Sequence, residues 1–459
     1  MYGDLTFRPL TVADISRGIE IESNSYPADE AASLDALCYR QRNAGDAFRG
    51  AFLKSSGVLV GFVCGTISSE TTLEHAAMEI GGHVPEGTSL CIHSVVVDKA
   101  YRRKGVATAM LRDYVMAVPE AFPLLDRILL ICKANLIHFY EMAAGFRFTR
   151  LWPHTHGRER WFEMKVDLAA MPAAHVDAFT SKAYEGNPAA VVMVPSHKPE
   201  PPDSWYVNVA GEMNLSETAF VRRTRLSEMD VADGKASYHL RWFTPTTEVD
   251  LCGHATLAAA HYLFSTGTAD MHSSSVKCSQ IIFSTKSGVL LADRTDGGIV
   301  LDFPAEVPSN SDLPQDAIQG LGIETGDIVS THRNRIDCFI VVKWAAFNRI
   351  NPDMAILKRV RTRGIIATTR NETNGKYHMI SRCFFPSVGV DEDPVTGSAH
   401  CGLVPLWCAR DGLVKCDYTC FQASKRGGVL RCEYDPNARG ERITIRGSGI
   451  ITLKSILLH

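Results

Sequence analysis

The sequence has no long hydrophobic run, no excess of one charge and no regular cysteine spacing. No apolar run reaches the ~18–20 residues that a membrane-spanning helix needs, so we expect no membrane association. The formal net charge is only -3, and without a basic field nucleic acid is not an expected partner. The first residues include Asp4 and no apolar core, which argues against a signal peptide. We therefore expect the 13 scattered cysteines to be reduced thiols of a cytoplasmic enzyme.

The length and composition are those of a folded protein with more than one domain. The chain has 459 residues, of which 45% are hydrophobic and 22% charged. A single hydrophobic core rarely grows beyond about 250–300 residues. We place a first domain at residues 1–168, a short linker rich in small residues at 169–174, and a second domain at 175–459.

The first domain alternates strand and helix patterns, which predicts an α/β fold. Dense runs of β-branched residues predict strands at 58–67, 90–97 and 128–132, and amphipathic or glycine-bounded stretches predict helices at 29–42, 105–118 and 136–143. The second domain is richer in short strands, with two apolar helices that each begin at a glycine, at 253–264 and 397–407. Two sets of strands, each with one apolar helix, indicate an internal duplication.

A basic, glycine-containing loop follows the strand at 90–97 and opens a helix. A helix N-terminus offers unpaired backbone N–H groups and a partial positive charge. Gly105 and Ala107 leave room for a bulky anion near the backbone. We predict a phosphate-binding loop, with a basic turn before a surface helix as the simpler alternative. The loop consists of Arg102, Arg103, Lys104, Gly105, Val106, Ala107 and Thr108.

The pattern Arg102-x-x-Gly105-x-Ala107, together with the later segment 135–146, resembles the GNAT family of N-acetyltransferases. The similarity covers residues 5–166 and is greatest to the arylalkylamine (serotonin) N-acetyltransferase branch, which has a stretch like residues 26–33. It implies a mixed sheet with flanking helices, acetyl-CoA as co-substrate and a small-molecule amine as acceptor. The residues that it implies in acetyl-CoA binding are Val95, Val97, the loop residues above, Asn135 and Tyr140.

Acetyl transfer requires the amine to lose a proton and the leaving thiolate to gain one. Tyr140, a phenol with an ordinary pKa near ~10, suits the second task. The resemblance implies that His93 accepts the proton of the amine; a core histidine and a packing tyrosine are the alternatives. The branch usually has a second histidine where this chain has Cys91. We interpret His154 and His156 as part of a solvated loop and expect no metal site.

Four further blocks occur in order in the second domain, at residues 185–191, 213–221, 241–256 and 391–400. Together they resemble the PhzF phenazine-biosynthesis family, which has the diaminopimelate epimerase-like fold. The resemblance implies strands wrapped around a central helix in each of two halves. It also implies a homodimer and no cofactor.

The two glycine-led helices predict a site for a small carboxylate between the halves. Gly253-His254 and Gly397-Ser398 each open a helix, so two N-termini can bind an anion. Ser216 and these four residues are the expected substrate contacts. Glu217, flanked by apolar residues, is left for acid/base chemistry, with an N-cap or surface acid as the alternative. The resemblance implies that His254, Asp393 and Ser398 orient the substrate and assist proton movement.

Three functions remain in competition. We favour a bifunctional enzyme, an acetyl-CoA-dependent amine N-acetyltransferase joined to a PhzF-like isomerase. In the alternative, only one domain is catalytic and the other is a binding or dimerisation module. A racemase would use two thiols, but only Cys252 precedes a glycine-led helix, and we expect Cys401 to point elsewhere. This contrast favours proton transfer by Glu217 alone.

Overall fold

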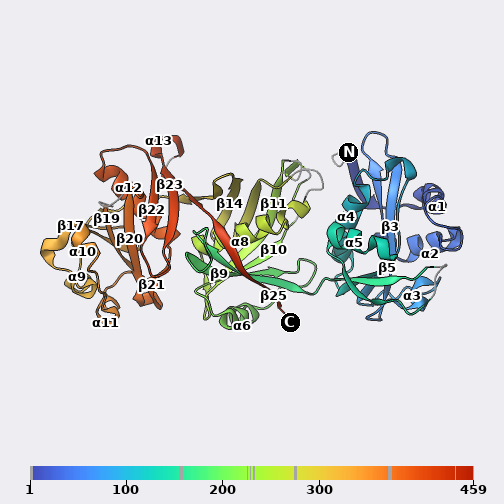
Figure 1. The fold of residues 1–459 in the computed structure, drawn as a ribbon, viewed down its shortest axis with the longest axis horizontal. Coiled ribbons are helices and arrows are strands. Elements are labelled where there is room, and N and C mark those ends of the chain that lie inside the picture. Colours follow the sequence, from blue (N-terminus) through green and yellow to red (C-terminus); the bar gives the residue numbers. More distant parts are fainter. Residues whose placement is uncertain are drawn as a thin grey trace. The chain divides into compact units, whose positions relative to one another are not determined.

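The computed structural model describes residues 4–154, 159–224, 226–227, 229–230, 233–272, 277–370, 375–439 and 441–457. The chain forms two compact units, and Figure 1 shows that both mix helices with strands. The first comprises residues up to Ala170 and Pro195–Glu200, and the second comprises Met171–Val194 and Pro201–Leu457. The second unit begins with a strand at Met171–Ala178, so residues 171–174, which we expected in the linker, are part of that strand.

The first unit is built on one seven-stranded mixed sheet in the order β1-β2-β3-β4-β5-β7-β6. Among its described strands, β4 and β5 form the only parallel pair. The strands are β1 (Leu5–Pro9), β2 (Phe48–Leu53), β3 (Leu59–Ser68), β4 (Ser89–Val97), β5 (Arg127–Cys132), β6 (Arg147–Leu151) and β7 (Phe162–Asp167). The helices are α1 (Ile15–Ser23), α2 (Leu34–Asn43), α3 (His75–Met78), α4 (Val106–Ala121) and α5 (Ile137–Ala144).

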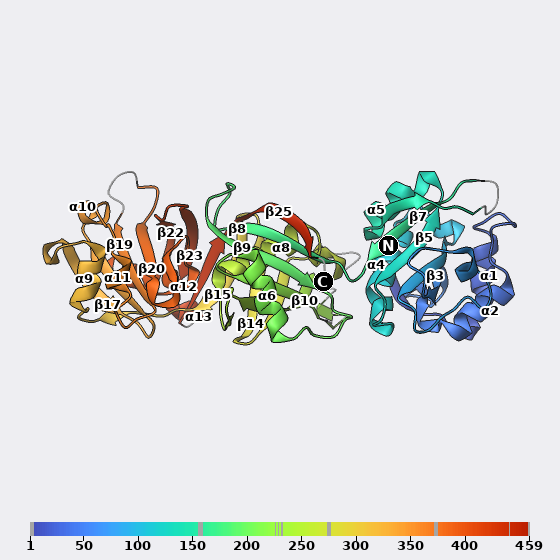
Figure 2. The same ribbon diagram turned by 90° about the horizontal axis from the view of Figure 1, so that it is seen from below.

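Helices cover both faces of this sheet, as Figures 1 and 2 show, with α1 and α2 on one face and α4 and α5 on the other. All of β3 is buried for this reason. Phe62 and Cys64 pack with the core beneath α1 and α2, whereas Val63 and Ile67 pack with the core beneath α4. The continuous apolar run that predicted this strand therefore reflects two buried faces.

The helix predicted at 29–42 starts later than expected, at Leu34. The Oγ of Ser33 accepts a hydrogen bond from the backbone N–H of Ala36 at 3.1 Å, which caps the helix there. The residues before it form turns after Pro27. The capping serine, and not the first acidic residue, marks the start of the helix.

The second unit contains two halves with the same strand order. In the first half the ladder runs β25-β8-β9-β10-β11-β13-β14-β15, and in the second it runs β16-β17-β18-β19-β20-β22-β23-β24. In each ladder the third and fifth pairings are parallel and the others antiparallel. The two halves are joined by β15 with β24. This repeated pattern confirms the predicted duplication.

The first half contains β8 (Met171–Ala178), β9 (Asn187–Val194), β10 (Thr218–Arg223), β11 (Lys235–Phe243), β12 (Glu248–Val249), β13 (Gln280–Thr285), β14 (Gly288–Thr295), β15 (Gly298–Pro304) and β25 (Gly449–Leu457). The second contains β16 (Ser309–Asn310), β17 (Ile328–Arg333), β18 (Asp337–Val342), β19 (Gly364–Arg370), β20 (Met379–Phe385), β21 (Val390–Asp393), β22 (Cys416–Gln422), β23 (Gly428–Tyr434) and β24 (Arg442–Gly447). The helices are α6 (Asp203–Met213), α8 (Gly253–Ser265), α9 (Gln315–Leu321), α10 (Trp344–Phe347), α11 (Met354–Leu357), α12 (Gly397–Arg410) and α13 (Pro436–Arg439).

One helix lies at the centre of each half. Most residues of α8 and of α12 are buried, and both helices contribute to the same large core. The two helices meet at their first residues, since a Cβ added to Gly253 would lie 3.9 Å from the Cα of Gly397. The two N-termini are therefore brought together at one place.

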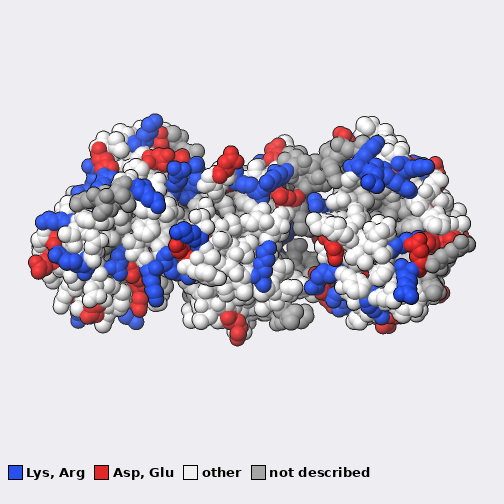
Figure 3. Space-filling model, viewed as in Figure 1, with Lys and Arg blue, Asp and Glu red and all other residues white. Residues whose placement is uncertain are grey.

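The cysteines are free thiols, and the surface carries charges of both signs (Figure 3). All 13 cysteines fall within the described residues and none forms a disulfide. None of the described helices is long and apolar enough to cross a membrane. Figure 3 shows acidic and basic side chains interspersed over the viewed face of both units.

Candidate active sites

A cavity of about 460 Å³ in the second unit lies where α8 and α12 begin. Both halves contribute to its wall. The first half supplies Ser216, Glu217, Cys252, Gly253 and His254, and the second supplies Arg335, Arg363, Asp393, Thr396, Gly397, Ser398 and Cys401. All the residues predicted at the second site are thus brought together.

Glu217 and His254 lie close together on the first-half side of the cavity. The Oε2 of Glu217 lies 3.3 Å from the Nε2 of His254, and their side chains are 19% and 8% exposed. This carboxylate oxygen is buried and forms no hydrogen bond with any of the described residues. The other ring nitrogen, Nδ1, lies 3.4 Å from the Sγ of Cys252. The imidazole is therefore held between a thiol and a carboxylate.

Asp393 is the second acid of the cavity. Burial raises the pKa of its carboxyl group and the nearby Glu217 carboxylate adds to the rise, while the charge of His254 and two hydrogen bonds oppose it. Those hydrogen bonds come from the Nδ2 of Asn187, at 2.9 Å, and from the hydroxyl of Thr396. The Nε2 of Gln422 donates to the backbone carbonyl of Asp393 at 2.7 Å and fixes the segment before α12.

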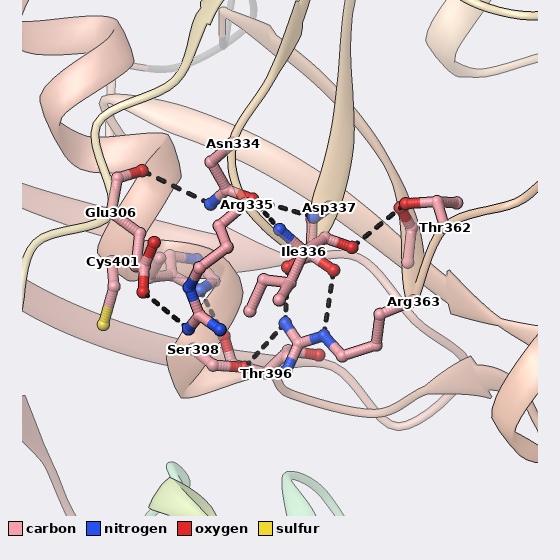
Figure 4. Close-up of polar contacts among 12 residues, drawn as sticks. Glu306, Asn334, Arg335, Ile336, Asp337, Thr362, Arg363, Thr396, Ser398 and Cys401 are labelled. Atoms are coloured by element: carbon pink, nitrogen blue, oxygen red, sulfur yellow. Dashed lines mark hydrogen bonds and ion pairs between the residues drawn. The ribbon is translucent and has the colours of Figure 1, made fainter.

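Sequence reasoning missed the arginine beside Ser398. The Nη2 of Arg363 donates to the Oγ of Ser398 at 3.2 Å, and the guanidinium forms an ion pair with the fully buried Asp337, as Figure 4 shows. Arg335 also lines the cavity and pairs with Glu306 at 3.0 Å. Neither arginine belongs to one of the four sequence blocks, so only their position in the fold reveals them.

Two cysteines line the cavity, which corrects one expectation. Cys401, which we expected to point elsewhere, is part of the wall, and its Sγ lies 3.6 Å from the backbone carbonyl of Gly397. The residue that matches Cys252 immediately before the second helix is Thr396. Burial raises the pKa of both the Cys252 and the Cys401 thiols, so neither is poised to act as a thiolate base.

In the first unit the basic loop lies at the start of α4, as predicted. Gly105 is the N-cap and has φ 80°, a left-handed conformation that favours glycine. Arg103 also has a positive φ, 60°. No side chain caps the helix, so its first-turn N–H groups are open to an anion. Val106 is buried, and Ala107 and Thr108 are partly exposed in this first turn.

Two of the loop's three cationic side chains, those of Arg102 and Lys104, bind the protein itself. The Nε of Arg102 donates to the backbone carbonyl of Val97 at 2.9 Å and its Nη2 donates to Ser25 at 2.9 Å. The Nζ of Lys104 donates to the carbonyl of Ala100 at 2.9 Å. These contacts brace the loop, so its backbone N–H groups and the exposed side chain of Arg103 are left to hold a phosphate. The open backbone N–H groups of the loop therefore fit the pyrophosphate of the acetyl-CoA that the family resemblance implies.

The sheet opens beside this loop. The strand β4 pairs with β5 only through Ser89, Leu90 and Cys91, although β4 continues to Val97. A small cavity of about 30 Å³ lies next to the opening and is lined by Val95, His93, Tyr140 and Glu30 among others. Asn135, in contrast, is exposed in the short turn before α5.

Tyr140 and His93 both face this cavity, but in different states. Burial raises the pKa of the Tyr140 phenol well above its usual range, so it stays protonated. Burial also lowers the pKa of His93, whose Nε2 lies 2.7 Å from the Thr66 hydroxyl and whose Nδ1 lies 3.1 Å from the Met78 sulfur. His93 is the extra residue of a β-bulge in β4. Both of its nitrogens are engaged by the protein.

Glu30 is an acid that sequence reasoning did not select. It lines the same cavity, and its Oε2 is buried without a hydrogen bond among the described residues. Its other oxygen forms an ion pair with the Nζ of Lys133 at 3.0 Å. In the sequence, residues 26–33 are notable only for their similarity to the arylalkylamine N-acetyltransferase branch. Its position beside Tyr140 depends on the folding of the whole unit.

Comparison with known proteins identifies both units. Residues 176–455 match the PhzC-PhzF family of phenazine biosynthesis-like proteins, which is more than half of the chain. The chain belongs to this family. Residues 16–146 match the GNAT acetyltransferase family. The two predicted family resemblances are confirmed.

Relatives of the PhzF unit come from bacteria and animals. An uncharacterized isomerase of Halalkalibacterium halodurans is 45% identical over 63% of this chain and 100% of that protein. The human phenazine biosynthesis-like domain-containing protein is 36% identical over 62% of this chain and 99% of that protein. The crystal structure of a PhzF family protein of Enterococcus faecalis matches with 34% identity and a TM-score of 0.54, over 63% of this chain and 100% of that chain.

Two groups of side chains bear on the expectation of no metal. Ligand atoms of Glu217, Cys252 and His254 lie within 4.8 Å of one another. The Cys252 thiol lies against the Nδ1 of His254 and the Glu217 carboxylate lies against its Nε2. In the GNAT unit His154 lies 3.4 Å from the Glu74 carboxylate, a partner we did not expect, and His156 lies outside the described residues.

Proposed function

We propose that the PhzF unit is an isomerase in which Glu217 moves a proton on a small carboxylate. The observation that carries this proposal is the Glu217–His254 pair, 3.3 Å apart, in a cavity where two helix N-termini meet. The N-termini attract an anionic substrate. The partly desolvated carboxylate beside them is suited to acid/base chemistry.

The proposed reaction transfers one proton and changes no oxidation state. The Oε2 of Glu217 takes a proton from a substrate carbon, and the electron pair of that C–H bond moves into the adjacent unsaturated system. The protonated Glu217 then returns the proton to a second carbon, so that the double bond shifts. The Nε2 of His254 lies 3.3 Å from this oxygen of Glu217, within reach of the transferring proton, and Asp393 lines the same cavity, where it can contact a heteroatom of the substrate.

The cavity favours this one-base route over a two-thiol racemase. A racemase needs a base on each face of the carbon, and the residue matching Cys252 is Thr396. Cys401 reaches the wall, but burial raises its pKa and its sulfur faces the carbonyl of Gly397. Because both thiols strongly prefer the neutral form, Glu217 is the better base.

The test of the isomerase is deuterium exchange in the full-length protein. In D₂O, the wild type should incorporate deuterium into a member of a panel of small unsaturated carboxylic acids, measured by mass spectrometry. Glu217→Gln should lower the rate by roughly 10²-fold or more, because the amide cannot accept the proton. Glu212→Gln, at an exposed position of α6, is the control and should exchange normally. Exchange at the wild-type rate in Glu217→Gln would remove this residue from the mechanism.

We infer that the GNAT unit is an amine N-acetyltransferase that uses acetyl-CoA. The open first turn of α4 behind the left-handed Gly105 supports this, together with the parting of β4 from β5 beside Tyr140. Acetyl-CoA supplies the activated acetyl group when bound. Tyr140, which stays protonated, is the group that gives a proton to the leaving sulfur, and the Glu30 carboxylate is better placed than His93 to accept one from the amine.

Replacement of Tyr140 separates catalysis from binding. With tyramine as acceptor, Tyr140→Phe should lower the rate of acetyl transfer by roughly tenfold or more, because the phenylalanine ring has no proton to give. The affinity for acetyl-CoA should remain within about twofold, since the ring itself is kept. Tyr39→Phe, on α2, is the matched control and should keep the rate. An unchanged rate in Tyr140→Phe would show that water protonates the thiolate.

A further inference from the structure

The duplicated fold places two residues at equivalent positions on either side of the PhzF cavity. Thr218 begins β10 and pairs in parallel with Ala190, three residues after Asn187. Gly364 begins β19 and pairs in parallel with Asp337, three residues after Asn334. The residues directly before these strands, Glu217 and Arg363, are therefore counterparts in the two halves.

The central helices extend the same equivalence. The helices α8 and α12 begin at Gly253 and Gly397, so the next residues, His254 and Ser398, also correspond. The Glu217 carboxylate lies 3.3 Å from the Nε2 of His254, and the Arg363 guanidinium lies 3.2 Å from the Oγ of Ser398. The two halves thus repeat one arrangement with opposite charge. Glu217 lies at the first helix N-terminus, and Arg363 lies at the second, where the hydrogen-bonded Asp393 is also found.

Several contacts hold the Arg363 side chain in this position, and the close-up in Figure 4 shows those with Asp337 and Ser398. Its Nε donates to the Oδ1 of Asp337 at 2.9 Å and its Nη2 contacts the other carboxylate oxygen. Asp337 is completely buried, and its backbone N–H donates to the side chain of Asn334 at 2.7 Å. The guanidinium also lies over the ring of Phe385, 5.3 Å from its centre. Its Nη1 has no hydrogen-bond partner within the described part of the chain.

Charge decides which helix receives the substrate's carboxylate. A carboxylate at the start of α8 would lie beside Glu217 and be repelled by it. At the start of α12 it would meet the free Nη1 of Arg363 and the backbone N–H groups of the first turn. The Asp393 carboxyl group also lies on this side, but burial raises its pKa and its oxygens accept hydrogen bonds from Asn187 and Thr396. Because the Oγ of Ser398 accepts a hydrogen bond from Arg363, the hydroxyl proton of Ser398 remains available for the carboxylate.

We propose that Arg363 and Ser398, with the N-terminus of α12, bind the carboxylate of the substrate and thereby direct its reacting carbon toward Glu217 and His254. This assignment rests on the proposed isomerase function and adds the orientation and class of its substrate. The substrate is a small carboxylic acid whose acidic C–H group is separated from the carboxylate by enough of the molecule to reach the opposite half. The duplicated site has one anion-binding side and one proton-transfer side.

The test compares an anion with its neutral isostere, benzoate with benzamide, by calorimetric titration of the full-length protein. Replacement of Arg363 alone would leave Asp337 buried and unpaired, so the variant is the double replacement Arg363→Gln with Asp337→Asn, whose amides can hydrogen-bond to each other. We expect benzoate to bind about tenfold or more weakly to this variant and benzamide to change by less than about twofold. The melting temperature reports whether the variant is folded.

Three further variants make the result decisive. Arg363→Lys keeps the charge and should bind benzoate within about threefold of the wild type if the variant folds. Arg382→Gln removes another paired arginine of the second half, outside the cavity, and should leave benzoate binding unchanged. Glu217→Gln should bind benzoate at least as tightly as the wild type, because it removes a nearby negative charge.

The proposal fails in either of two ways. Wild-type protein that binds benzoate no better than benzamide would show that the cavity has no anion-binding side. Benzoate binding that is lost in Glu217→Gln but kept in the Arg363 double variant would reverse the orientation. The isomerase function is judged separately by deuterium exchange, so Glu217→Gln that binds benzoate yet still exchanges would overturn that function without touching the anion site.

Discussion

At the scale of single residues, the burial of Asp393 lowers the free energy of unfolding at a pH where its carboxyl group would otherwise be ionised. Its carboxyl group is buried close to Glu217, and this burial raises its pKa. In the unfolded chain the group ionises near its ordinary pKa of about 3.9. The folded protein retains the proton to a higher pH, so folding loses free energy as the pH rises through the folded-state pKa.

Asp393→Asn should therefore become relatively more stable as the pH rises. The amide cannot ionise, and its oxygen can still accept the hydrogen bond from Asn187. We expect the melting temperature of the variant, minus that of the wild type, to be larger at pH 8 than at pH 4, measured by calorimetry. Asp391→Asn, two residues away and exposed, should show no such trend. A difference that stays constant between these pH values would contradict the buried-acid interpretation.

At the scale of elements, the start of α4 shows how one glycine serves both fold and site. Gly105 occupies the N-cap in a left-handed conformation, and no side chain caps the helix. An L-residue with a Cβ is strained in this conformation. The same absence of a side chain leaves the first-turn N–H groups accessible to a phosphate.

Gly105→Ala should weaken both properties. We expect a loss of about 1 kcal/mol in the free energy of unfolding, measured with urea, because of the positive φ. Acetyl-CoA affinity, measured by calorimetric titration, should fall as well, since the added methyl group displaces the loop. Gly45→Ala is a matched control in the same unit, because that glycine has no positive φ and only a distant neighbour. Equal behaviour of the two variants would show that the conformation of Gly105 is unimportant.

At the scale of the whole molecule, each unit has a hydrophobic core of its own. Leu130 belongs to the core of the GNAT unit, whereas Leu257 belongs to the large core of the PhzF unit. A ligand that binds one folded unit stabilises that unit by mass action, by about 2.7 kcal/mol at a hundred times its dissociation constant. Acetyl-CoA should therefore raise the stability of the GNAT unit and leave that of the PhzF unit unchanged.

We expect calorimetry of the full chain to give two transitions, of which acetyl-CoA raises one. Leu130→Ala should lower the transition that acetyl-CoA raises, and Leu257→Ala should lower the other, because each leaves a cavity in one core. A shift of both transitions by acetyl-CoA would show that the units unfold together. No shift of either transition would favour the alternative in which the first unit serves as a module without this co-substrate.

The local sequence determined much of the fold and of the site. Buried strands and glycine-led helices were recognisable because their signals lie within a few consecutive residues, as at Gly253 and Gly397. The family resemblance selected Glu217, His254, Asp393 and Ser398, and the structure places all of them on one cavity. The start of the helix predicted at 29–42 was wrong, because the capping Ser33 places the first helical residue at Leu34.

Only the tertiary structure decided which other residues join these sites. Arg363 meets Ser398 across 35 positions of sequence, and Glu30 meets Lys133 across 103. Such contacts depend on strand register and on the packing of separate segments, which no local pattern encodes. The opposite charges of Glu217 and Arg363 become meaningful only when the two halves are aligned by their hydrogen-bonded strands. The sequence alone thus determined the elements and the first acid, while the long-range pairing determined the cation that faces it.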